Sequence, residues 1–441
     1  MSTPRGADPK RPASRRPAAP TTPTTRPFIR ERRALTNVGG PSERSGEPAL
    51  ADQLVHALDV EGADPERPPE PGEASEPAER THVHGFHSYP ARMHPETARR
   101  LVEDLSRPRD RVLDPFCGSG TVLVEARLAG RAVLGVDANP LAVRLARLKV
   151  FGSTEGERER LVAAARQVAA VADARREARV GASRRYGPED VALLDGHVLL
   201  ELDGLRVGLD ELRSDALRAD LELVLSAILT KVSRRASDTS DQALPRRIAA
   251  GYPARLFVRK AEELARRLAE VAPALATAPP ATIEEGDARE LRGIQTGSID
   301  LVVTSPPYPG VYDYLAQHEA RLRWLRLPRA SFDRAEVGAR RRLEPLGAAE
   351  GLARWQAELG AILSAMARVL RPRAPAVLLI ADSVIAGAPA YALDRVRAAA
   401  PPAGLTVRAT ASQARPHFHG PSARAFAERP RREHAILLTR A

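Results

Sequence analysis

The chain of 441 residues has very few of the residues that build disulfides or thiolate metal sites. Its one cysteine, Cys117, excludes a disulfide within the chain and a cysteine-rich zinc site. Aromatic residues make up only 4% of the chain, and no apolar run is long enough to cross a membrane. The N-terminus also lacks the apolar stretch of a secretory signal peptide. These absences predict a cytoplasmic protein with no membrane partner.

The charge of the chain is basic. Lys and Arg number 67 against 56 Asp and Glu, which gives a formal net charge of +11. Such an excess favours a polyanionic partner. The preference for arginine and the 38 prolines are also typical of a GC-rich genome, so charge alone is a weak indicator of nucleic-acid binding. The length and the hydrophobic share of 43% predict one large or two ordinary globular domains.

The most informative stretch runs from Arg111 to Asn139. Its pattern predicts, in order, an apolar strand at 112–113, a turn over 114–120, a helix over 122–128 and a second apolar strand at 132–136. Gly118 and Gly120 allow the backbone of the turn to approach a ligand closely. Asp137 follows the second strand at the spacing by which a nucleotide-binding βαβ unit places a carboxylate on ribose hydroxyls.

The residues of this turn distinguish between nucleotide ligands. A phosphate-binding P-loop needs a lysine after its last glycine, and here Thr121 follows Gly120. A dinucleotide-binding turn needs a third glycine, roughly where Glu125 stands. Asp114, at the end of the first strand, would repel a pyrophosphate but attract an ammonium or a sulfonium. The sequence therefore indicates S-adenosylmethionine as the cofactor.

The segments DPFCGSGT and GVDANP resemble the cofactor-binding half of class I S-adenosylmethionine-dependent methyltransferases, in the wording common among enzymes that methylate amino groups of nucleic acids. The resemblance implies that Asp114, Phe116, Gly118 and Gly120 surround the methionine end and that Asp137 binds the ribose. By the same analogy Asp287 would meet the cofactor adenine, and Tyr89 would close over the cofactor. The predicted cofactor-binding residues are Asp114, Pro115, Phe116, Gly118, Gly120, Thr121, Asp137, Asp287 and Tyr89.

A second motif, TSPPY, follows the predicted strand at 298–303. Its prolines fix the backbone and leave carbonyl groups free to accept hydrogen bonds. Ser305 and the Pro306 carbonyl would accept the two protons of an exocyclic amine, while the ring of Tyr308 would stack on an extruded base. The motif resembles the [DNS]PP[YF] signature of amino-methyltransferases, and its serine form favours cytosine over adenine. The predicted catalytic residues are Ser305, Pro306, Pro307 and Tyr308.

Two other kinds of chemistry are disfavoured. A C5-cytosine methyltransferase attacks through a cysteine in a separate loop, whereas Cys117 lies inside the cofactor turn. Four histidines gather in the segment 81–105, but no acidic or thiol residue stands among them between positions 82 and 94, so no metal site is predicted. These histidines are His82, His84, His87 and His94.

Strands alternating with helices predict an α/β fold, namely a doubly wound, mostly parallel, seven-stranded Rossmann-like methyltransferase sheet with a helical insertion. Four segments follow from the pattern. Residues 1–80 are predicted to form a disordered Pro/Arg-rich tail, 81–151 the cofactor-binding half, 152–255 a helical insertion that is a candidate target-recognition element, and 256–441 the catalytic half.

The leading hypothesis is a site-specific DNA methyltransferase, specific for cytosine N4 or adenine N6, of the kind found in restriction-modification systems. An RNA methyltransferase acting on guanine N2 or adenine N6 is the first alternative, because tRNA guanine-N2 enzymes have similar motifs. A non-catalytic nucleic-acid-binding protein with the same fold is the second. The sequence does not give the target site or the oligomeric state.

Overall fold

The computed structural model describes residues 42–60, 80–90, 92–235, 247–415 and 423–440. Most of the predicted tail, residues 1–41 and 61–79, lies outside these ranges. Within them, no helix combines the length and the apolar character that a membrane crossing requires.

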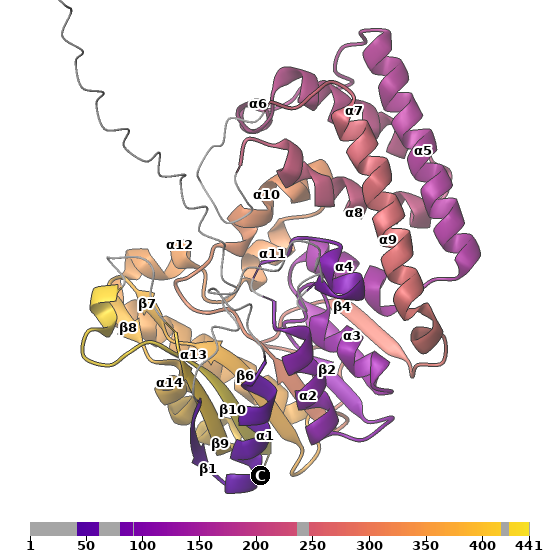
Figure 1. Cartoon of the computed structure of the whole chain (residues 1–441). Coiled ribbons are helices and arrows are strands. Elements are labelled where there is room, and N and C mark those ends of the chain that lie inside the picture. The colour runs from indigo at the N-terminus through magenta and orange to yellow at the C-terminus, as the bar shows by residue number, and fades with distance from the viewer. Residues whose placement is uncertain (1–41, 61–79, 91, 236–246, 416–422, 441) are drawn as a thin grey trace, which may run out of the picture. The chain divides into compact units, whose positions relative to one another are not determined.

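One eight-stranded sheet organises the described chain, in the order β1-β9-β10-β6-β5-β2-β3-β4 (Figure 1). Strands β4, β3, β2, β5 and β6 are parallel to one another. Strand β10 pairs antiparallel with β6 and β9, and β1 pairs antiparallel with β9. The predicted fold class is confirmed, with one strand more than the seven expected. The strands are β1 (Ser42–Gly46), β2 (Arg111–Asp114), β3 (Ala132–Asp137), β4 (Ala281–Glu285), β5 (Leu301–Thr304), β6 (Pro375–Ala381), β9 (Leu405–Ala414) and β10 (Arg432–Arg440).

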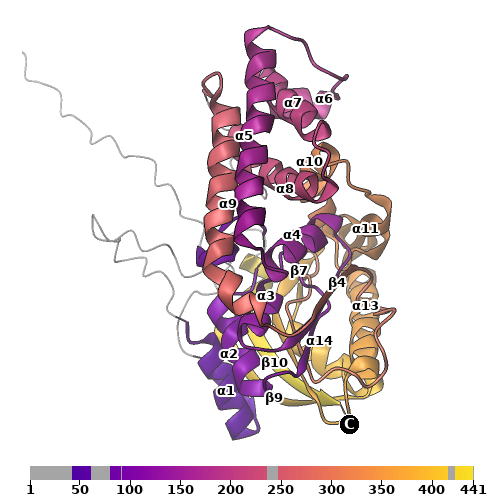
Figure 2. The same ribbon diagram turned by 90° about the vertical axis from the view of Figure 1, so that its right-hand side faces the viewer.

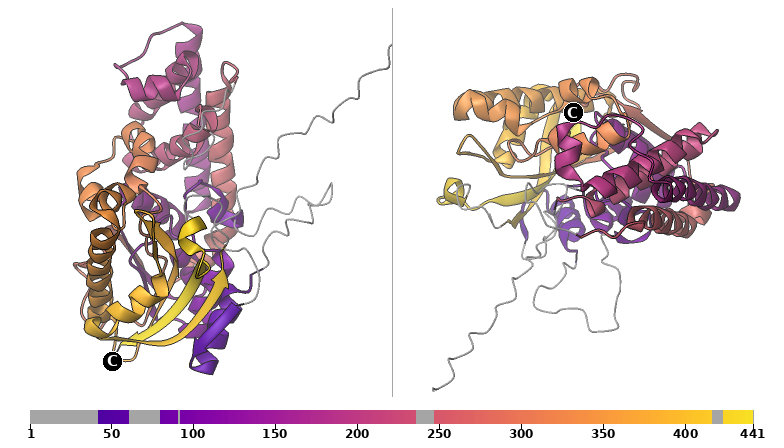
Figure 3. Two further views of the ribbon diagram at one scale, coloured as in Figure 1. Left: turned by 90° about the vertical axis from the view of Figure 1, so that its left-hand side faces the viewer. Right: turned by 90° about the horizontal axis from the view of Figure 1, so that it is seen from above.

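The additional strand corrects the predicted tail. Residues 42–60 form β1 and α1 (Pro48–Leu58), and β1 pairs with β9 from Ser42 opposite Gln413 to Gly46 opposite Ala409. In Figure 3 the indigo β1 lies beside β9, the strand with which it pairs. Strand β1 is a polar edge strand with the sequence SERSG, so it has no hydrophobic pattern from which a strand could be predicted. The tail prediction is therefore wrong for this segment.

Helices cover both faces of the sheet, so β6 is buried from Ala376 to Ala381. Ala376, Leu378 and Ile380 pack into one core cluster, whereas Val377 and Leu379 pack into another. Figure 2 shows α2 on one side of the sheet and α13 on the other. The cluster of Val377 and Leu379 contains α1, α2 (Pro95–Leu105), α3 (Thr121–Leu128) and α4 (Pro140–Val150), and the cluster of Ala376, Leu378 and Ile380 contains α13 (Gly347–Val369) and α14 (Ala392–Ala399).

Five helices follow one another between α4 and β4. They are α5 (Glu155–Glu177), α6 (Pro188–Leu193), α7 (Gly196–Asp210), α8 (Asp215–Val232) and α9 (Tyr252–Ala276). Helix α5 starts at a capping box of Thr154 and Glu157 and packs along α7 and α9 (Figure 1). Gly204 on α7 permits this close approach, because a Cβ there would lie 2.9 Å from the Cα of Ala172.

Shorter elements complete the part of the chain that the structure describes. They are η2 (His82–Gly85), α10 (Tyr314–Trp324), α11 (Ala330–Ala335), α12 (Arg340–Leu343), η3 (Glu344–Leu346), η4 (Pro401–Ala403), η5 (Arg424–Phe426) and the hairpin of β7 (Ser383–Ile385) and β8 (Ala388–Ala390).

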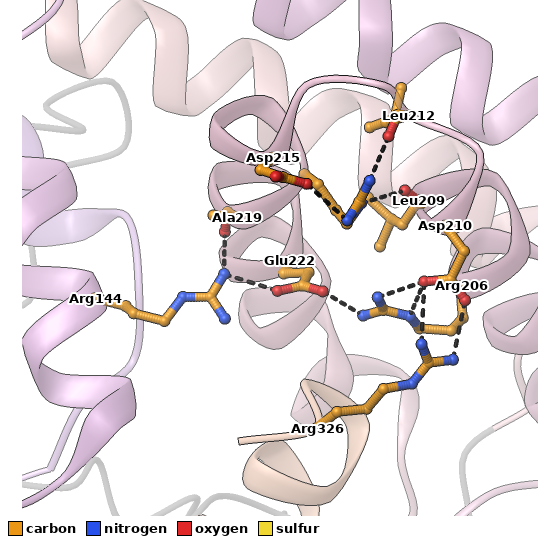
Figure 4. A network of polar contacts seen from close by, with 10 residues as sticks. Arg144, Arg206, Leu209, Asp210, Leu212, Asp215, Ala219, Glu222 and Arg326 are labelled. Atoms are coloured by element: carbon orange, nitrogen blue, oxygen red, sulfur yellow. Dashed lines mark hydrogen bonds and ion pairs between the residues drawn. The ribbon is translucent and has the colours of Figure 1, made fainter. Parts of the chain in front are cut away.

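A network of ion pairs ties the helical segment to α4 (Figure 4). Glu222 on α8 forms ion pairs with Arg144 Nη2 of α4 at 2.7 Å and with Arg206 Nη1 of α7 at 2.6 Å. Asp210 pairs with both Arg206 and Arg326, at 2.6 and 2.9 Å. The side chain of Arg206 is only 4% exposed, so this arginine is engaged inside the protein.

The network predicts a large effect of one substitution on stability. Glu222 is only 8% exposed, so Glu222→Ala removes a carboxylate from both Arg144 and Arg206, of which Arg206 keeps its pair with Asp210. We expect the free energy of unfolding, measured by urea denaturation, to fall by about 3 kcal/mol or more. Glu262→Ala is the matched control, because it removes the exposed pair with Arg166 and should cost about 1 kcal/mol or less. Equal losses in the two variants would contradict the structural role of Glu222.

Candidate active site

Asp114 ends β2 at the carboxyl edge of the sheet and is 3% exposed. Its Oδ1 accepts hydrogen bonds from Thr304 Oγ1 at 2.7 Å and from the backbone N–H of Phe116 at 3.1 Å. Burial raises the pKa of Asp114 to about 7. The bond to Thr304, 190 positions further along the chain, joins the ends of β2 and β5, so the two predicted motifs begin side by side.

The glycine turn adopts the backbone conformation that its sequence predicts. Gly118 and Gly120 have φ angles of 50° and 86°, in the left-handed region that favours glycine. Gly120 immediately precedes α3, and a Cβ on it would lie 3.0 Å from Ala146 of α4. The turn is therefore both tightly bent and packed against the next helix.

Asp137 ends β3 and holds the turn from the other side. Its carboxylate accepts from the backbone N–H groups of Gly118 and Asn139, both at 2.8 Å. Burial raises the pKa of Asp137 to about 6. The side chain of Asn139 donates to the hydroxyl of Tyr89 at 3.3 Å, so this loop also positions Tyr89.

Tyr89 lies over the glycine turn. Its ring stacks on His318 with the ring centroids 4.9 Å apart, and a Cβ on Gly118 would approach the Tyr89 ring to 3.3 Å. The ring therefore lies beside the glycine turn, and the predicted closing of Tyr89 over the cofactor stays a prediction.

One cleft contains residues of both motifs. The predicted residues that line it are Tyr89, Asp114, Phe116, Gly118, Thr121 and Ser305. Arg92, Met93, Cys117, Ser119 and Val122 complete its wall. The predicted residues outside this lining are Pro115, Gly120, Asp137, Asp287, Pro306, Pro307 and Tyr308.

The double-proline loop leaves β5 and turns its serine toward the cleft. Ser305 is half-buried, Pro306 is buried, and Tyr308 is only 6% exposed. The Tyr308 hydroxyl donates to Glu433 Oε1 of β10 at 2.7 Å, and Arg415 pairs with the same carboxylate at 2.5 Å. The structure thus engages the hydroxyl of Tyr308, a contact that the sequence does not predict. The stacking role of its ring stays a prediction.

Asp287 lies two residues beyond β4, next to β3 in the sheet. Its carboxylate accepts from the backbone N–H of Arg289 at 2.9 Å and from the Arg289 guanidinium at 2.6 Å. In this structure the Asp287 carboxylate is therefore hydrogen-bonded to Arg289. The predicted contact of Asp287 with the cofactor adenine stays a prediction.

The histidines before the cofactor turn do have an acidic companion in space. Glu125 of α3 lies 2.7 Å from His84 Nε2 and 3.8 Å from His82 Nε2, a geometry that could hold a metal ion. Burial, together with the positive charge of Lys149, keeps the pKa of His84 well below its usual value. The contact between His84 and Glu125 attaches η2 to α3.

The other two predicted histidines lie elsewhere. His87 Nε2 contacts Ser226 Oγ at 2.9 Å, and His94 accepts from the backbone N–H of Glu96 at the start of α2. Their roles are explained by local packing and helix capping.

Sequence reasoning missed three residues that position the site, Thr304, Asn139 and Glu433. Thr304 and Asn139 are members of the motifs TSPPY and GVDANP, so their place in these motifs was the available signal. Glu433 is 1% exposed at the start of a strand whose next residues are mostly buried. A charged residue in such a strand indicates a buried partner, but the partner lies far away in the sequence.

Comparison with known proteins agrees with the cofactor half of this site. Residues 65–148 match the family model described as DNA methylase. This methylase segment contains Tyr89, the glycine turn and Asp137, and it ends before the double-proline loop. The match therefore supports an amino-methyltransferase family from the cofactor side alone.

Curated relatives show the same partial likeness. The chain is 39% identical over 70 residues to the type II methyltransferase M.MvaI of Kocuria varians, which is 15% of each chain. It is 44% identical over 73 residues to a tRNA (guanine(10)-N2)-dimethyltransferase of Methanothermobacter thermautotrophicus, covering 16% of this chain and 21% of that protein. The chain thus matches about a fifth or less of the length of these relatives.

Among solved structures, a SAM-dependent methyltransferase from Methanosarcina mazei has 11% identity and a TM-score of 0.30, over 77% of this chain and 96% of that one. A TM-score of 0.30 does not establish a relationship between the two proteins.

The residues of the methylase segment fit S-adenosylmethionine. Asp114 offers a buried carboxylate to a cationic ligand, and the ring of Phe116 offers an apolar surface beside it. Gly118 brings bare backbone to the cleft, where a longer side chain would meet Tyr89.

Proposed function

We propose that the chain transfers a methyl group from S-adenosylmethionine to the exocyclic amino group of a base in DNA, with cytosine N4 as the acceptor. The observation that carries the proposal is the cleft that Asp114, Gly118 and Ser305 line together. It offers a place where a methyl donor held by the first motif faces an acceptor held by the second.

The cofactor half holds and orients the donor. S-adenosylmethionine supplies an electrophilic methyl group on a sulfonium sulfur. Asp114 stabilises the positive charge of the methionine end, Gly118 permits close backbone contact, and Tyr89 covers the site. Asp137, at the end of β3, would meet the ribose hydroxyls. Its two backbone hydrogen bonds fix the direction of the carboxylate toward the turn.

The acceptor half raises the reactivity of a poor nucleophile. The lone pair of an exocyclic amine is delocalised into its ring until hydrogen bonds to its protons favour a pyramidal nitrogen. Ser305 and the carbonyl of Pro306 accept those protons, while Pro307 keeps the loop rigid. Orientation supplies most of the acceleration, because no strong base has to act before the methyl group moves.

The type of nucleic acid rests on the family model and on the serine of the second motif. The DNA methylase model and the type II relative favour DNA, and serine in place of aspartate favours cytosine N4. The tRNA dimethyltransferase match favours RNA guanine N2 as the second candidate. Adenine N6 is the remaining acceptor with the same chemistry.

Incubation with methyl-labelled S-adenosylmethionine and DNA, tRNA or rRNA, followed by nucleoside mass spectrometry, tests the proposal. We expect label in N4-methylcytosine from DNA. N6-methyladenine from DNA would correct the acceptor, and N2-methylguanine from RNA would replace DNA by the second candidate. No label in any nucleic acid would contradict the proposed function.

The pKa of Asp114 predicts a pH dependence of cofactor binding. In the free protein this carboxyl titrates near pH 7, and only the ionised form attracts a cation. Lowering the pH from 8 to 6 should therefore weaken the affinity for S-adenosylmethionine by about tenfold, as measured by calorimetry. Asp114→Asn should remove this dependence, and the ratio of the two Kd values cancels the titration of the cofactor itself. A constant ratio from pH 6 to 8 would exclude Asp114 as the group responsible.

A further inference from the structure

A buried hydrogen bond joins the first residue of the second motif to the carboxylate of the cofactor turn. Thr304 Oγ1 donates to Asp114 Oδ1 at 2.7 Å, across the neighbouring strands β5 and β2. Thr304 is 0% exposed, so its hydroxyl has no contact with solvent. One oxygen of Asp114 is therefore held from the strand that leads into the double-proline loop.

The two oxygens of Asp114 have different surroundings. Oδ1 also accepts the backbone N–H of Phe116 at 3.1 Å, so both hydrogen bonds that Asp114 accepts from the described residues go to this oxygen. Asp114 nevertheless lines the cleft, together with Ser305. Because the protein holds Oδ1, Oδ2 is the oxygen left to meet a ligand there.

The charge of the carboxylate decides what Thr304 contributes. An ionised carboxylate can only accept hydrogen bonds, so the Thr304 hydroxyl donates to it and stabilises the ionised form. Burial acts in the opposite direction and raises the pKa of Asp114 to about 7. Close to neutral pH, the loss of one donor would therefore remove much of the negative charge from the cleft.

The other titratable groups around Asp114 do not replace this donor. Asp137, at the end of β3, is a second carboxylate and accepts instead from two backbone N–H groups. Cys117 and Tyr89 line the cleft and stay neutral, because burial raises the pKa of both groups well above the usual value. Arg92 also lines the cleft, and its guanidinium stays protonated at every pH that a protein tolerates.

We propose that Thr304 is a positioning residue, which binds Oδ1 of Asp114 so that the ionised carboxylate presents Oδ2 to the cationic end of S-adenosylmethionine. The inference rests on the proposed function, from which it takes the contact between Asp114 and the cofactor. It adds a physical link between the two motifs. Thr304 directly precedes Ser305, so the residue that orients the carboxylate also anchors the start of the acceptor loop.

Thr304→Val tests the bond, because valine keeps the branched shape of threonine and lacks its hydroxyl. Without this donor we expect the pKa of Asp114 to rise by about one unit. Only the ionised form attracts the cofactor, so the Kd for S-adenosylmethionine should be about five- to tenfold above that of the wild type between pH 6 and 7. At pH 8.5 Asp114 is mostly ionised in both proteins, and the two Kd values should agree within about twofold.

The pH dependence separates this role from a purely structural one. Calorimetry with S-adenosylmethionine and no nucleic acid gives the ratio of the Kd values of Thr304→Val and the wild type from pH 6 to 8.5. The titrations of the cofactor and of Asp137 are common to both proteins and cancel in this ratio. General damage to the site would raise the ratio by the same factor at every pH, whereas the proposed role predicts a ratio that falls toward one as the pH rises.

Three further variants control the test. Thr410→Val removes a buried hydroxyl from β9, which β10, β6 and β5 separate from β2, so its ratio to the wild type should stay near one at every pH. Thr304→Ser keeps the donor and should restore the pH dependence of the wild type. Thr304→Ser and Thr304→Ala differ only in the hydroxyl, so the ratio of their Kd values repeats the test if Thr304→Val does not fold.

The outcomes separate the inference from the function on which it rests. A ratio that does not change with pH, or an equal pH-dependent rise in Thr304→Ser or Thr410→Val, would overturn the inference and leave the proposed function standing. A wild type that binds S-adenosylmethionine but methylates no nucleic acid would overturn the proposed function, while the ratio would still decide the role of Thr304. A wild type that does not bind the cofactor would overturn both.

Discussion

Ser305→Ala should lower kcat for methyl transfer by about 100- to 1000-fold while the affinity for S-adenosylmethionine is retained. Ser305 is the residue of the second motif that lines the cleft, and in the proposed function its oxygen accepts a proton of the reacting amine. Removing it leaves the nitrogen lone pair delocalised at the moment of attack. The measurement is a single-turnover assay with saturating nucleic acid and labelled cofactor, together with calorimetric binding of the cofactor.

Ser298→Ala provides the control for this substitution. Ser298 precedes the same strand, β5, and its hydroxyl donates to the backbone carbonyl of Gln295 at 2.7 Å. Like Ser305→Ala, the Ser298→Ala substitution removes a hydroxyl oxygen, but at the other end of β5. It should therefore leave kcat unchanged. Loss of cofactor binding in Ser305→Ala would mean that the acceptor site has been misplaced and that Ser305 belongs to the cofactor site.

Gly120→Ala should weaken cofactor binding by about tenfold or more, because it displaces the turn that in the proposed function contacts the cofactor. Alanine at a φ of 86° costs about 1–2 kcal/mol, and its Cβ would lie 3.0 Å from both Cα and Cβ of Ala146. The contact is with the backbone of α4, so α3 and the turn would have to move. Calorimetry with S-adenosylmethionine and the thermal midpoint of unfolding measure the two effects.

Gly130→Ala separates the strain of the backbone from the displacement of the turn. Gly130 has a φ of 79°, similar to that of Gly120, but a Cβ there would meet no atom within 4 Å. We expect a modest loss of stability and an unchanged affinity for the cofactor. If both variants bound the cofactor as the wild type does, the glycine turn would not be the cofactor site.

The part of the site that local sequence determines was predictable. The sequence from β2 to β3 contains its strands, its helix and its left-handed glycines within thirty positions, so short-range patterns were sufficient. The same holds for the double-proline loop, where the two prolines fix the backbone whatever surrounds them. That the loop shares a cleft with Asp114 followed from the rule that parallel strands present their carboxyl ends at one edge of a sheet.

The rest of the site depends on contacts between distant segments. Glu125 belongs to α3, yet it completes the histidine cluster of η2, and no pattern within either segment indicates the other. Glu433 meets Tyr308 from 125 positions away. The edge strand β1 is polar and short, so only its pairing with β9 reveals it. Such features are decided by tertiary packing, which overrides local preference.

A crystal structure of the chain with bound S-adenosylmethionine would test most directly the claim that the two motifs form one reaction centre. We predict that the methionine end lies beside Asp114, Phe116 and Gly118, with the sulfonium methyl directed across the cleft toward Ser305. A cofactor bound elsewhere, or bound here with its methyl group directed away from Ser305, would contradict the account.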